Sequence, residues 1–209
     1  MMILLSGGRL PITWYNGDYV QMLPLTSMPL RPVDSLGYPG RTYKFYNGPT
    51  LYPFGYGLSY TQFKYNLLSF TKTIQVNLNK LQHSRNLNYT SDASKTRCPG
   101  VLVNDLRCDD YFEFKVDVQN VGSTDGSDVV IVYSKPPAEI AATYIKQVIG
   151  FQRVFVRAGR NKRIKFVFNA CKSLNIVDYA ANTLLPAGEH TIFVGNGGVS
   201  FPIHLNFNY

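Results

Sequence analysis

The chain is poor in the residues from which metal sites, redox sites and membrane anchors are built. It has only three cysteines in 209 residues and no CxxC spacing, which excludes a zinc ribbon and a thioredoxin-like site. No window approaches about eighteen consecutive apolar residues, so we predict no membrane-spanning helix. The apolar start at residues 1–5 is too short for the core of a signal peptide.

Acidic residues are also scarce, at 13 against 21 basic ones, and glutamate occurs only at Glu113, Glu139 and Glu189. Glu113 lies on the polar side of a predicted strand, and the other two follow turn residues. Charged residues in such places are normally solvated, so none of the three is a candidate general acid, base or nucleophile.

The acidic cluster, the histidines and Ser59 do not match known site motifs either. An acidic cluster beside Cys108 lacks the ligand spacing of a calcium loop, and the histidines show no paired spacing. Thr61 stands where a nucleophile elbow centred on Ser59 would need glycine. The acidic cluster is Asp105, Asp109 and Asp110, and the histidines are His83, His190 and His204. We therefore predict no catalytic, metal-binding or cofactor-binding residue.

The formal net charge of +8 raises the question of a polyanionic partner. In FQRVFV and RIKFVF, however, basic and apolar residues largely alternate, which is typical of the solvated face of an antiparallel hairpin. We favour that interpretation and predict no nucleic-acid partner, while a surface for acidic polysaccharide remains the alternative. The basic residues are Arg153, Arg157, Arg160, Lys162, Arg163 and Lys165.

The spacing of two cysteines favours an extracellular protein. Cys98 and Cys108 lie ten residues apart in a predicted loop, and we expect a disulfide between them, the alternative being two free thiols. Asn88 begins an N-glycosylation sequon in the same loop. Both features favour secretion, although the chain as written has no secretion signal.

Residues 61–209 read as one mostly β domain. Alternating or β-branched runs separated by glycine and proline turns predict seven or eight strands, spaced as in an immunoglobulin-like β-sandwich. The runs are 63–70, 73–78, 111–118, 128–133, 147–156, 163–168, 191–194 and 199–207. Pro202 in the last run predicts that this strand lies at a sheet edge.

Residues 38–60 form an aromatic stretch rich in glycine and proline. This composition predicts an ordered loop without a helix or long strand, held by its rings. We expect the loop to act as a clamp between two domains, the alternative being a stacking platform for sugars. The residues expected to form it are Tyr38, Arg41, Tyr43, Phe45, Tyr46, Tyr52, Phe54 and Tyr56.

Residues 1–37 contain one predicted strand, at 10–15, followed by a segment broken by prolines. A lone strand leaves its backbone groups unpaired, so this part is expected to be the remnant of a larger domain.

Several long motifs in fixed order carry a family resemblance. They are GRLPITWY, YPGRTYKFYNGP, YPFGYGLSYTQF, NVGSTDGSDVVIVYSKPP, IKQVIGFQRVFVRAG and LLPAGEHTIFVGNGG. In this order they resemble the C-terminal part of glycoside hydrolase family 3, in particular plant β-xylosidase and α-L-arabinofuranosidase enzymes. The resemblance covers nearly the whole chain from Gly7.

The resemblance implies a domain organisation for the parent enzyme. Members of the family carry a catalytic barrel with an aspartate nucleophile, then an α/β sandwich domain, and then a fibronectin type III-like β-sandwich. It implies that residues 1–37 are the C-terminal remnant of the α/β sandwich domain, 38–60 an interdomain loop and 61–209 the fibronectin type III-like domain. No position matches the nucleophile or acid/base motif. The chain is thus expected to be an inactive C-terminal fragment of a secreted retaining enzyme that acts on xylan or arabinoxylan. The expected partners are the catalytic domains and, from the family, plant cell-wall polysaccharide.

Overall fold

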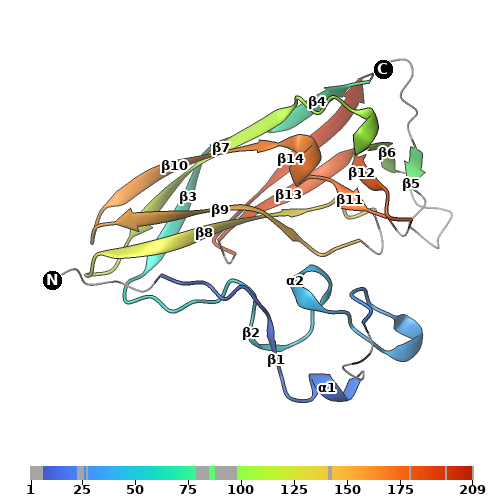
Figure 1. Ribbon diagram of the computed structural model, residues 1–209. Helices are drawn as coiled ribbons and strands as arrows, with labels where there is room; N and C mark the ends of the chain where they lie inside the picture. The colour runs from blue at the N-terminus through green and yellow to red at the C-terminus, as the bar shows by residue number, and fades with distance from the viewer. Residues whose placement is uncertain are drawn as a thin grey trace.

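The computed structural model of the protein describes residues 7–22, 26, 28–78, 85–87, 98–140, 143–178, 180–195 and 197–208. Two β-sheets packed face to face form the larger part, and residues 7–60 lie as a separate layer beneath them (Figure 1). The Asn88 sequon and His83 lie outside the described residues.

The two sheets confirm the predicted mostly β sandwich. One has the strand order β10-β7-β3, and the other has the order β4-β14-β13-β8-β9. All neighbours are antiparallel except β4 and β14. The strands are β3 (Phe63–Phe70), β4 (Thr73–Asn77), β7 (Tyr111–Asn120), β8 (Gly126–Lys135), β9 (Gln147–Val156), β10 (Asn161–Asn169), β13 (Gly188–Val194) and β14 (Val199–Asn208).

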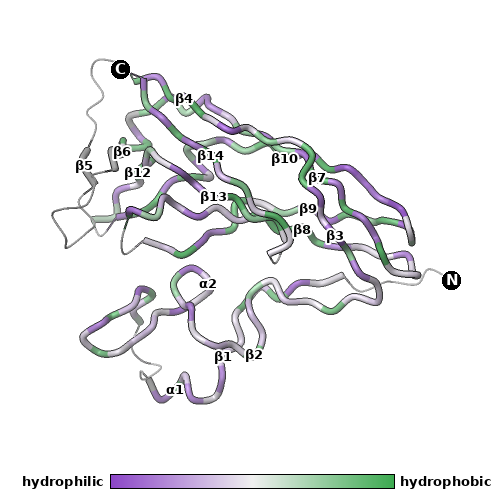
Figure 2. Tube along the Cα trace, turned by 180° about the vertical axis from the view of Figure 1, so that it is seen from behind, coloured by the Kyte–Doolittle hydropathy of each residue, from purple (hydrophilic) through white to green (hydrophobic). Residues whose placement is uncertain are grey.

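The core lies between the sheets because apolar residues alternate with polar ones along the strands (Figure 2). On β7, Phe112, Phe114, Val116 and Val118 are buried, as the sequence predicts. The rings of Phe114 and Phe166 stack at 5.1 Å across the β7–β10 pair. Burial of these side chains supplies the main driving force for the fold.

Two predicted strand placements are wrong. Residues 151–168 do not form a hairpin, because β9 pairs with β8 in one sheet and β10 pairs with β7 in the other. The intervening turn therefore crosses from sheet to sheet. The last strand, β14, is not at an edge either, since it lies between β4 and β13. Pro202 is tolerated because the pairing of β14 with β4 begins only at His204, so no ladder donor is lost at position 202.

The fold is completed by short elements that the sequence pattern did not predict. A third sheet has the order β11-β12-β6-β5 and includes part of the predicted loop that contains Cys98 and Cys108. Its strands are β5 (Arg85–Leu87), β6 (Cys98–Leu102), β11 (Ile176–Val177) and β12 (Thr183–Pro186), and the helical turns nearby are η2 (Val103–Asp105) and α3 (Ala170–Ser173).

The layer formed by residues 7–60 contains a second strand that the sequence analysis missed. Strand β1 (Trp14–Tyr15) pairs with β2 (Thr50–Tyr52), inside the stretch expected to be an irregular loop. Three residues amid glycine and proline are too few for a detectable alternation. The remaining elements are single turns, namely α1 (Tyr19–Met22), η1 (Asp34–Leu36) and α2 (Thr42–Phe45).

The disulfide joins a different pair of cysteines from the predicted one. Cys108 is bonded to Cys171, with a Cα–Cα distance of 5.7 Å, so the Cys98–Cys108 pairing is wrong. The reason is strand register: Tyr111 of β7 faces Asn169 of β10, and the two bonded cysteines follow just beyond that end of the pair. Cys98 belongs to β6, where it is opposite Leu87.

We predict that loss of this bridge destabilises the sandwich strongly. It spans 63 positions, for which loop-closure entropy gives about 4 kcal/mol, or a drop in Tm of about 10 °C. The Cys108→Ala variant should show this loss in thermal unfolding monitored by circular dichroism. Cys98→Ser is the control and should unfold like the parent chain, whereas equal losses in the two variants would contradict the observed pairing.

Candidate functional site

Residues 7–60 pack against the outer face of β8. Tyr43 and Phe54 stack with ring centroids 4.1 Å apart, and both meet the edge of Tyr133, at 6.2 and 6.3 Å. Tyr133 is only 1% exposed although it points away from the core. Nearer the N-terminus the backbone lies so close to β8 that a side chain at Gly7 would overlap the carbonyl of Ser127. One side of this layer is therefore in tight contact with the sandwich.

Further contacts extend the attachment beyond β8. The carbonyl of Lys44 accepts a hydrogen bond from Ile145 N at 2.6 Å, and the hydroxyl of Tyr43 accepts one from Val148 N at 3.2 Å. Phe45 packs on a small cluster formed by Ile140, Tyr144, Ile176 and Leu184. The guanidinium of Arg31 lies 5.1 Å over the Phe45 ring. These contacts come from the single helical turn α2, so the prediction that residues 38–60 contain no helix is wrong at this point.

Tyrosines build a small core inside the layer. Tyr15 and Tyr19 stack at 4.0 Å, and Tyr46 meets both edge-on. The hydroxyl of Tyr19 donates to Gly40 O at 2.9 Å, and that of Tyr38 donates to Pro29 O at 3.0 Å. Burial, together with the hydrogen bond to Tyr38, raises the pKa of Tyr19. Rings with polar tips let this segment bury apolar area while satisfying the carbonyls of a proline-rich backbone.

A buried ionic contact joins the layer to both sheets. Arg9 Nη2 donates to Asp128 Oδ1 at 2.5 Å, while the hydroxyl of Tyr65, on β3 of the other sheet, donates to Asp128 Oδ2. Asp128 is 2% exposed and lies on the inner side of β8, opposite Val154. Burial and the neighbouring Asp128 carboxylate raise the pKa of Tyr65. A carboxylate so deeply buried needs these donors.

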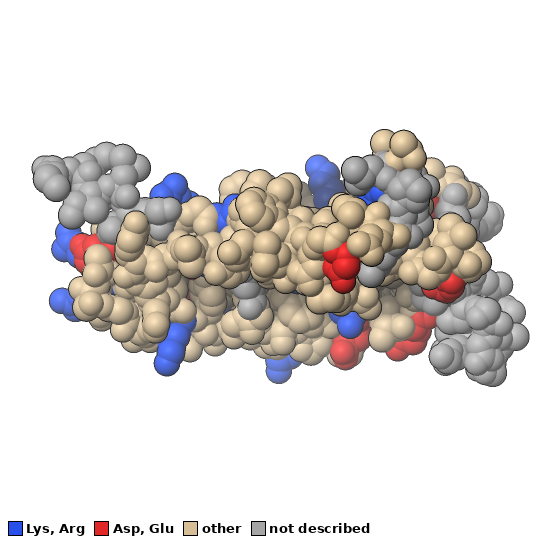
Figure 3. Space-filling model, turned by 90° about the horizontal axis from the view of Figure 1, so that it is seen from below, with Lys and Arg blue, Asp and Glu red and all other residues tan. Residues whose placement is uncertain are grey.

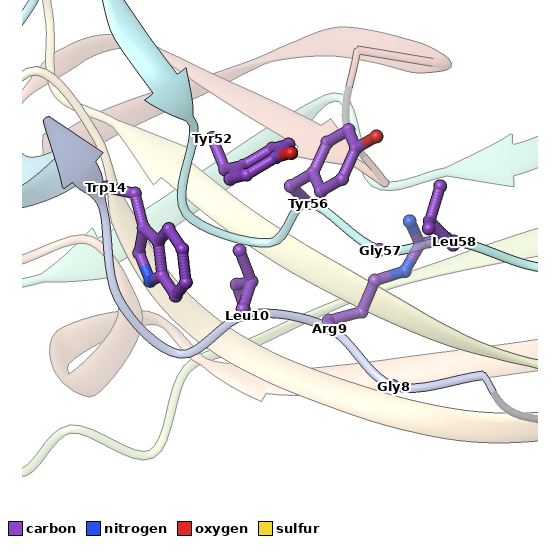
Figure 4. A pocket seen from close by; sticks show the side chains of 8 residues that line it. All are labelled: Gly8, Arg9, Leu10, Trp14, Tyr52, Tyr56, Gly57 and Leu58. Carbon is purple, nitrogen blue, oxygen red and sulfur yellow. The ribbon is translucent and has the colours of Figure 1, made fainter. Parts of the chain in front are cut away.

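A pocket of about 400 Å³ opens on the layer where residues 8–14 run beside 52–58 (Figure 4). The rings of Tyr52 and Tyr56 lie 4.9 Å apart on one side, with Trp14 and Leu10 on the other. The two segments touch closely, because Leu10 N donates to Tyr56 O at 2.7 Å. A side chain at Gly57 would overlap the carbonyl of Gly8, so glycine is required there.

The side of the layer turned away from the sandwich is largely uncharged (Figure 3). The layer leaves large apolar side chains in solvent, among which Leu58 and Tyr60 are each 76% exposed. Among the described residues of the layer, those exposed are Ile12, Trp14, Val20, Met28, Leu30, Leu36, Leu51, Leu58 and Tyr60. So many exposed apolar residues in a short segment are typical of an interaction surface.

The rings expected in the aromatic loop thus fall into three groups, and Arg41 has a separate role. Tyr38 and Tyr46 belong to the tyrosine core, as the ring cluster shows. Tyr43, Phe45 and Phe54 contact the sandwich, whereas Tyr52 and Tyr56 line the pocket. Arg41 supports the loop through its backbone, which donates to Leu30 O at 2.9 Å.

Sequence reasoning missed Arg9, Asp128 and Tyr133. A signal was present for Asp128, because it occupies an inward position in the alternation of β8, and a buried carboxylate requires a cation from elsewhere. Nothing in the sequence identifies Arg9 as that cation.

The glutamates have the surface positions expected of them. Glu113 pairs with Lys165 at 2.6 Å, and this hydrogen bond lowers the pKa of Glu113. Glu189 lies 3.4 Å from His204.

Within the described ranges, no three His, Cys, Asp or Glu residues are grouped so that they could hold a metal ion. The helices in the same ranges are all too short or too polar to cross a bilayer.

Comparisons with known proteins find similar sequences among β-xylosidases. The profile of the fibronectin type III-like domain matches residues 128–197. The chain is 38% identical to the probable beta-D-xylosidase 6 of Arabidopsis thaliana over 91% of its own length and 24% of that protein. It is 32% identical to beta-xylosidase/alpha-L-arabinofuranosidase 1 of Medicago sativa subsp. varia, over 90% and 23% of the respective lengths.

Among solved structures, the chain is similar to a GH3 exo-beta-xylosidase (XlnD) in complex with a xylobiose aziridine activity-based probe. The TM-score is 0.73 and the identity 26%, over 97% of this chain and 24% of the other. The chain therefore spans about a quarter of the length of the relatives it matches.

We predict that Arg9→Met loosens the layer from the sandwich. It leaves Asp128 buried without its cation, at a cost of about 2–4 kcal/mol, toward the lower end because Arg9 itself is partly exposed. Urea unfolding should show the loss, and Asp128→Asn in the same chain should recover much of it. Lys64→Met removes an exposed charge and serves as the control; if it costs as much as Arg9→Met, the buried contact is not responsible.

We also predict that His190 makes stability depend on pH. The imidazole is buried on β13, with Nε2 2.9 Å from Pro186 O and Nδ1 without a partner among the described residues. Burial lowers the pKa of His190 to about 4. The unfolded chain takes up this proton first, so stability should fall by roughly 3 kcal/mol as pH drops from about 6.5 to 4.

Urea midpoints measured between pH 7 and pH 4 test this. His190→Gln keeps a donor near the Nε2 position and should flatten the profile, whereas the exposed control His204→Gln should not. A profile unchanged by His190→Gln would assign the acid sensitivity to other groups.

Proposed function

Because this chain belongs to glycoside hydrolase family 3, matching the fibronectin type III-like region of its β-xylosidase-type members, we propose that it is a docking scaffold for the catalytic body of such an enzyme. It contributes no catalytic group. The enzyme as a whole removes xylosyl or arabinosyl units from xylan-type glycans, as the names of its relatives suggest.

The observation that carries this proposal is the two-sided layer of residues 7–60. One side is bonded to the sandwich through Tyr43, Phe54 and the Arg9–Asp128 pair. Away from these contacts the layer has an open pocket lined by Trp14 and Tyr52, and its described residues include further exposed apolar side chains such as Leu58 and Tyr60. A surface of this kind is stable in water only when a partner covers it. In this proposal the partner is the catalytic domains.

The carboxyl groups that retaining hydrolysis requires support a purely structural role for this chain. Retaining hydrolysis needs two carboxyl groups about 5 Å apart across the scissile bond, one attacking and one protonating the leaving group. Glu113 and Glu189 instead pair with basic residues on the sandwich surface, and Asp128 is buried against Arg9.

We place the enzyme outside the cell, in the cell wall, with Asn88 glycosylated. The Cys108–Cys171 disulfide supports this, since such bonds persist mainly in oxidising compartments.

A second candidate function is a stand-alone sugar-binding module, which the aromatic pocket favours. Tyr52 and Tyr56 expose tilted rings beside Trp14, and sugar rings stack on such faces. Affinity electrophoresis in neutral arabinoxylan separates the two functions, because unretarded migration of the chain would eliminate this module.

We predict that the chain alone does not hydrolyse aryl xylosides or arabinofuranosides. Mixed with an Arabidopsis relative from which the matching quarter has been deleted, it should restore xyloside turnover, because it supplies the missing scaffold. Leu58→Glu places a charge on the exposed side of the layer and should reduce the restored activity at least tenfold. Val167→Glu puts the same charge at an exposed apolar position on β10, so it is the control and should reduce the restored activity less than twofold.

Turnover by the chain alone would contradict the scaffold role. Equal effects of the two variants would contradict docking through residues 7–60.

A further inference from the structure

Strand β9 carries a row of alternating rings and cations on its outer side. Val154 and Val156 are buried in the core, so the residues between and before them point away from it. Phe151 is 71% exposed and Phe155 49% exposed. The row on the strand is Phe151, Arg153 and Phe155, at steps of about 6.6 Å, which is twice the rise per residue of a strand, and Arg157 continues it directly after the end of β9 at Val156.

The position of β9 keeps this row accessible. It is the edge strand of its sheet, with β8 as its single neighbour among the described strands. The layer of residues 7–60 covers Tyr133 on β8 and contacts β9 at Val148, before the first ring of the row. The row is thus distinct from the pocket lined by Trp14 and Tyr52.

The cations of the row are not neutralised, unlike those of β10, the next strand along the chain. On β10, Arg163 lies 3.7 Å from Asp117 and Lys165 lies 2.6 Å from Glu113. Among the described residues, no carboxylate lies within ion-pair distance of Arg153 or Arg157. Asp125 is close to the end of the row, where it accepts a hydrogen bond from Ala158 N at 2.8 Å. Arg160 follows in the turn and Lys162 at the start of β10, so the local charge remains positive.

We propose that this row binds an anionic glycan, with sugar rings stacked on Phe151 and Phe155 and uronic-acid carboxylates on Arg153 and Arg157. Exposed aromatic rings offer flat apolar faces to sugars, and a guanidinium binds a carboxylate through two parallel hydrogen bonds. The inference rests on the proposed function in taking the anion to be a glycan. It adds a surface that would hold the enzyme on acidic regions of the polymer.

Single-stranded nucleic acid is the competing polyanion, because its binding sites also combine rings and cations. It carries a phosphate at every nucleotide, and its affinity grows with the number of cations in contact. Only two cations alternate with the rings on β9, which suits a polymer with widely spaced charges better. The test below includes this competitor as an outcome.

The test uses the full chain and isothermal titration at low salt. The probes are a xylo-oligosaccharide bearing glucuronic acid groups, a neutral one of equal length, and a single-stranded oligonucleotide of equal charge. We expect the acidic oligosaccharide to bind at least tenfold more tightly than either of the other two. Arg153→Gln with Arg157→Gln should weaken that binding at least tenfold, and Phe151→Ala with Phe155→Ala should do likewise.

Lys64→Gln with Lys115→Gln is the matched control, because it removes the same charge from exposed positions on the other sheet. This control should change the affinity for the acidic oligosaccharide less than twofold. If it weakens binding as much as the arginine variant does, the binding depends on net charge alone and the inference is overturned. Absence of binding to the acidic oligosaccharide, or equal binding of the oligonucleotide, would also overturn it.

The restored xyloside turnover of the mixed enzyme separates this inference from the docking role. If the arginine variants bind no acidic glycan but restore turnover normally, the row is a glycan site and docking stands. If they abolish the restored turnover, the row belongs to the docking surface and the glycan inference fails.

Discussion

The carboxylate of Asp128, buried on the inner side of β8, is the point at which the three layers of the molecule meet. It accepts hydrogen bonds from Arg9 of the N-terminal layer and from Tyr65 of the opposite sheet. A carboxylate 2% exposed is costly unless its charge is balanced, and the balancing cation comes from outside the sandwich. The sandwich therefore reaches its most stable state only when Arg9 is in place, so the two parts act as one body.

Glycine, proline and aromatic residues together order the stretch from residue 38 to residue 60. Proline and glycine fix tight turns, and the tyrosine hydroxyls satisfy the carbonyls that such a backbone leaves free, as Tyr46 does for Pro49 at 2.9 Å. The rings then divide between an internal core, the face of β8 and the pocket around Trp14. A loop this well filled can transmit the position of one domain to the next, which an unstructured linker cannot do.

The parts of this fold that could be predicted are those with a period in the sequence. Strand β9 has the predicted limits because its run of apolar and β-branched residues is bounded by turns, and the inward set of β7 follows from its unbroken alternation. The disulfide could not be predicted from cysteine spacing, because the partner of Cys108 is set by the register of β7 and β10, which are distant in sequence. Strand β2 was missed since its three residues need Trp14 and Tyr15 as partners. The pocket and the role of Arg9 depend on packing between segments, for which a single sequence carries no direct signal.

The pairing of β14 has a consequence for the order in which the protein can fold during synthesis. This strand lies between β4 and β13, so the sheet lacks an interior strand until the ribosome has released residues 199–208. Strand β4 is made early and has no other partner among the described strands. The backbone donors and acceptors on this edge of β4 therefore stay unpaired while residues 78–198 are made, a period in which an unpaired strand is open to wrong associations. A nascent chain of this kind depends on protection from aggregation until β14 has been made.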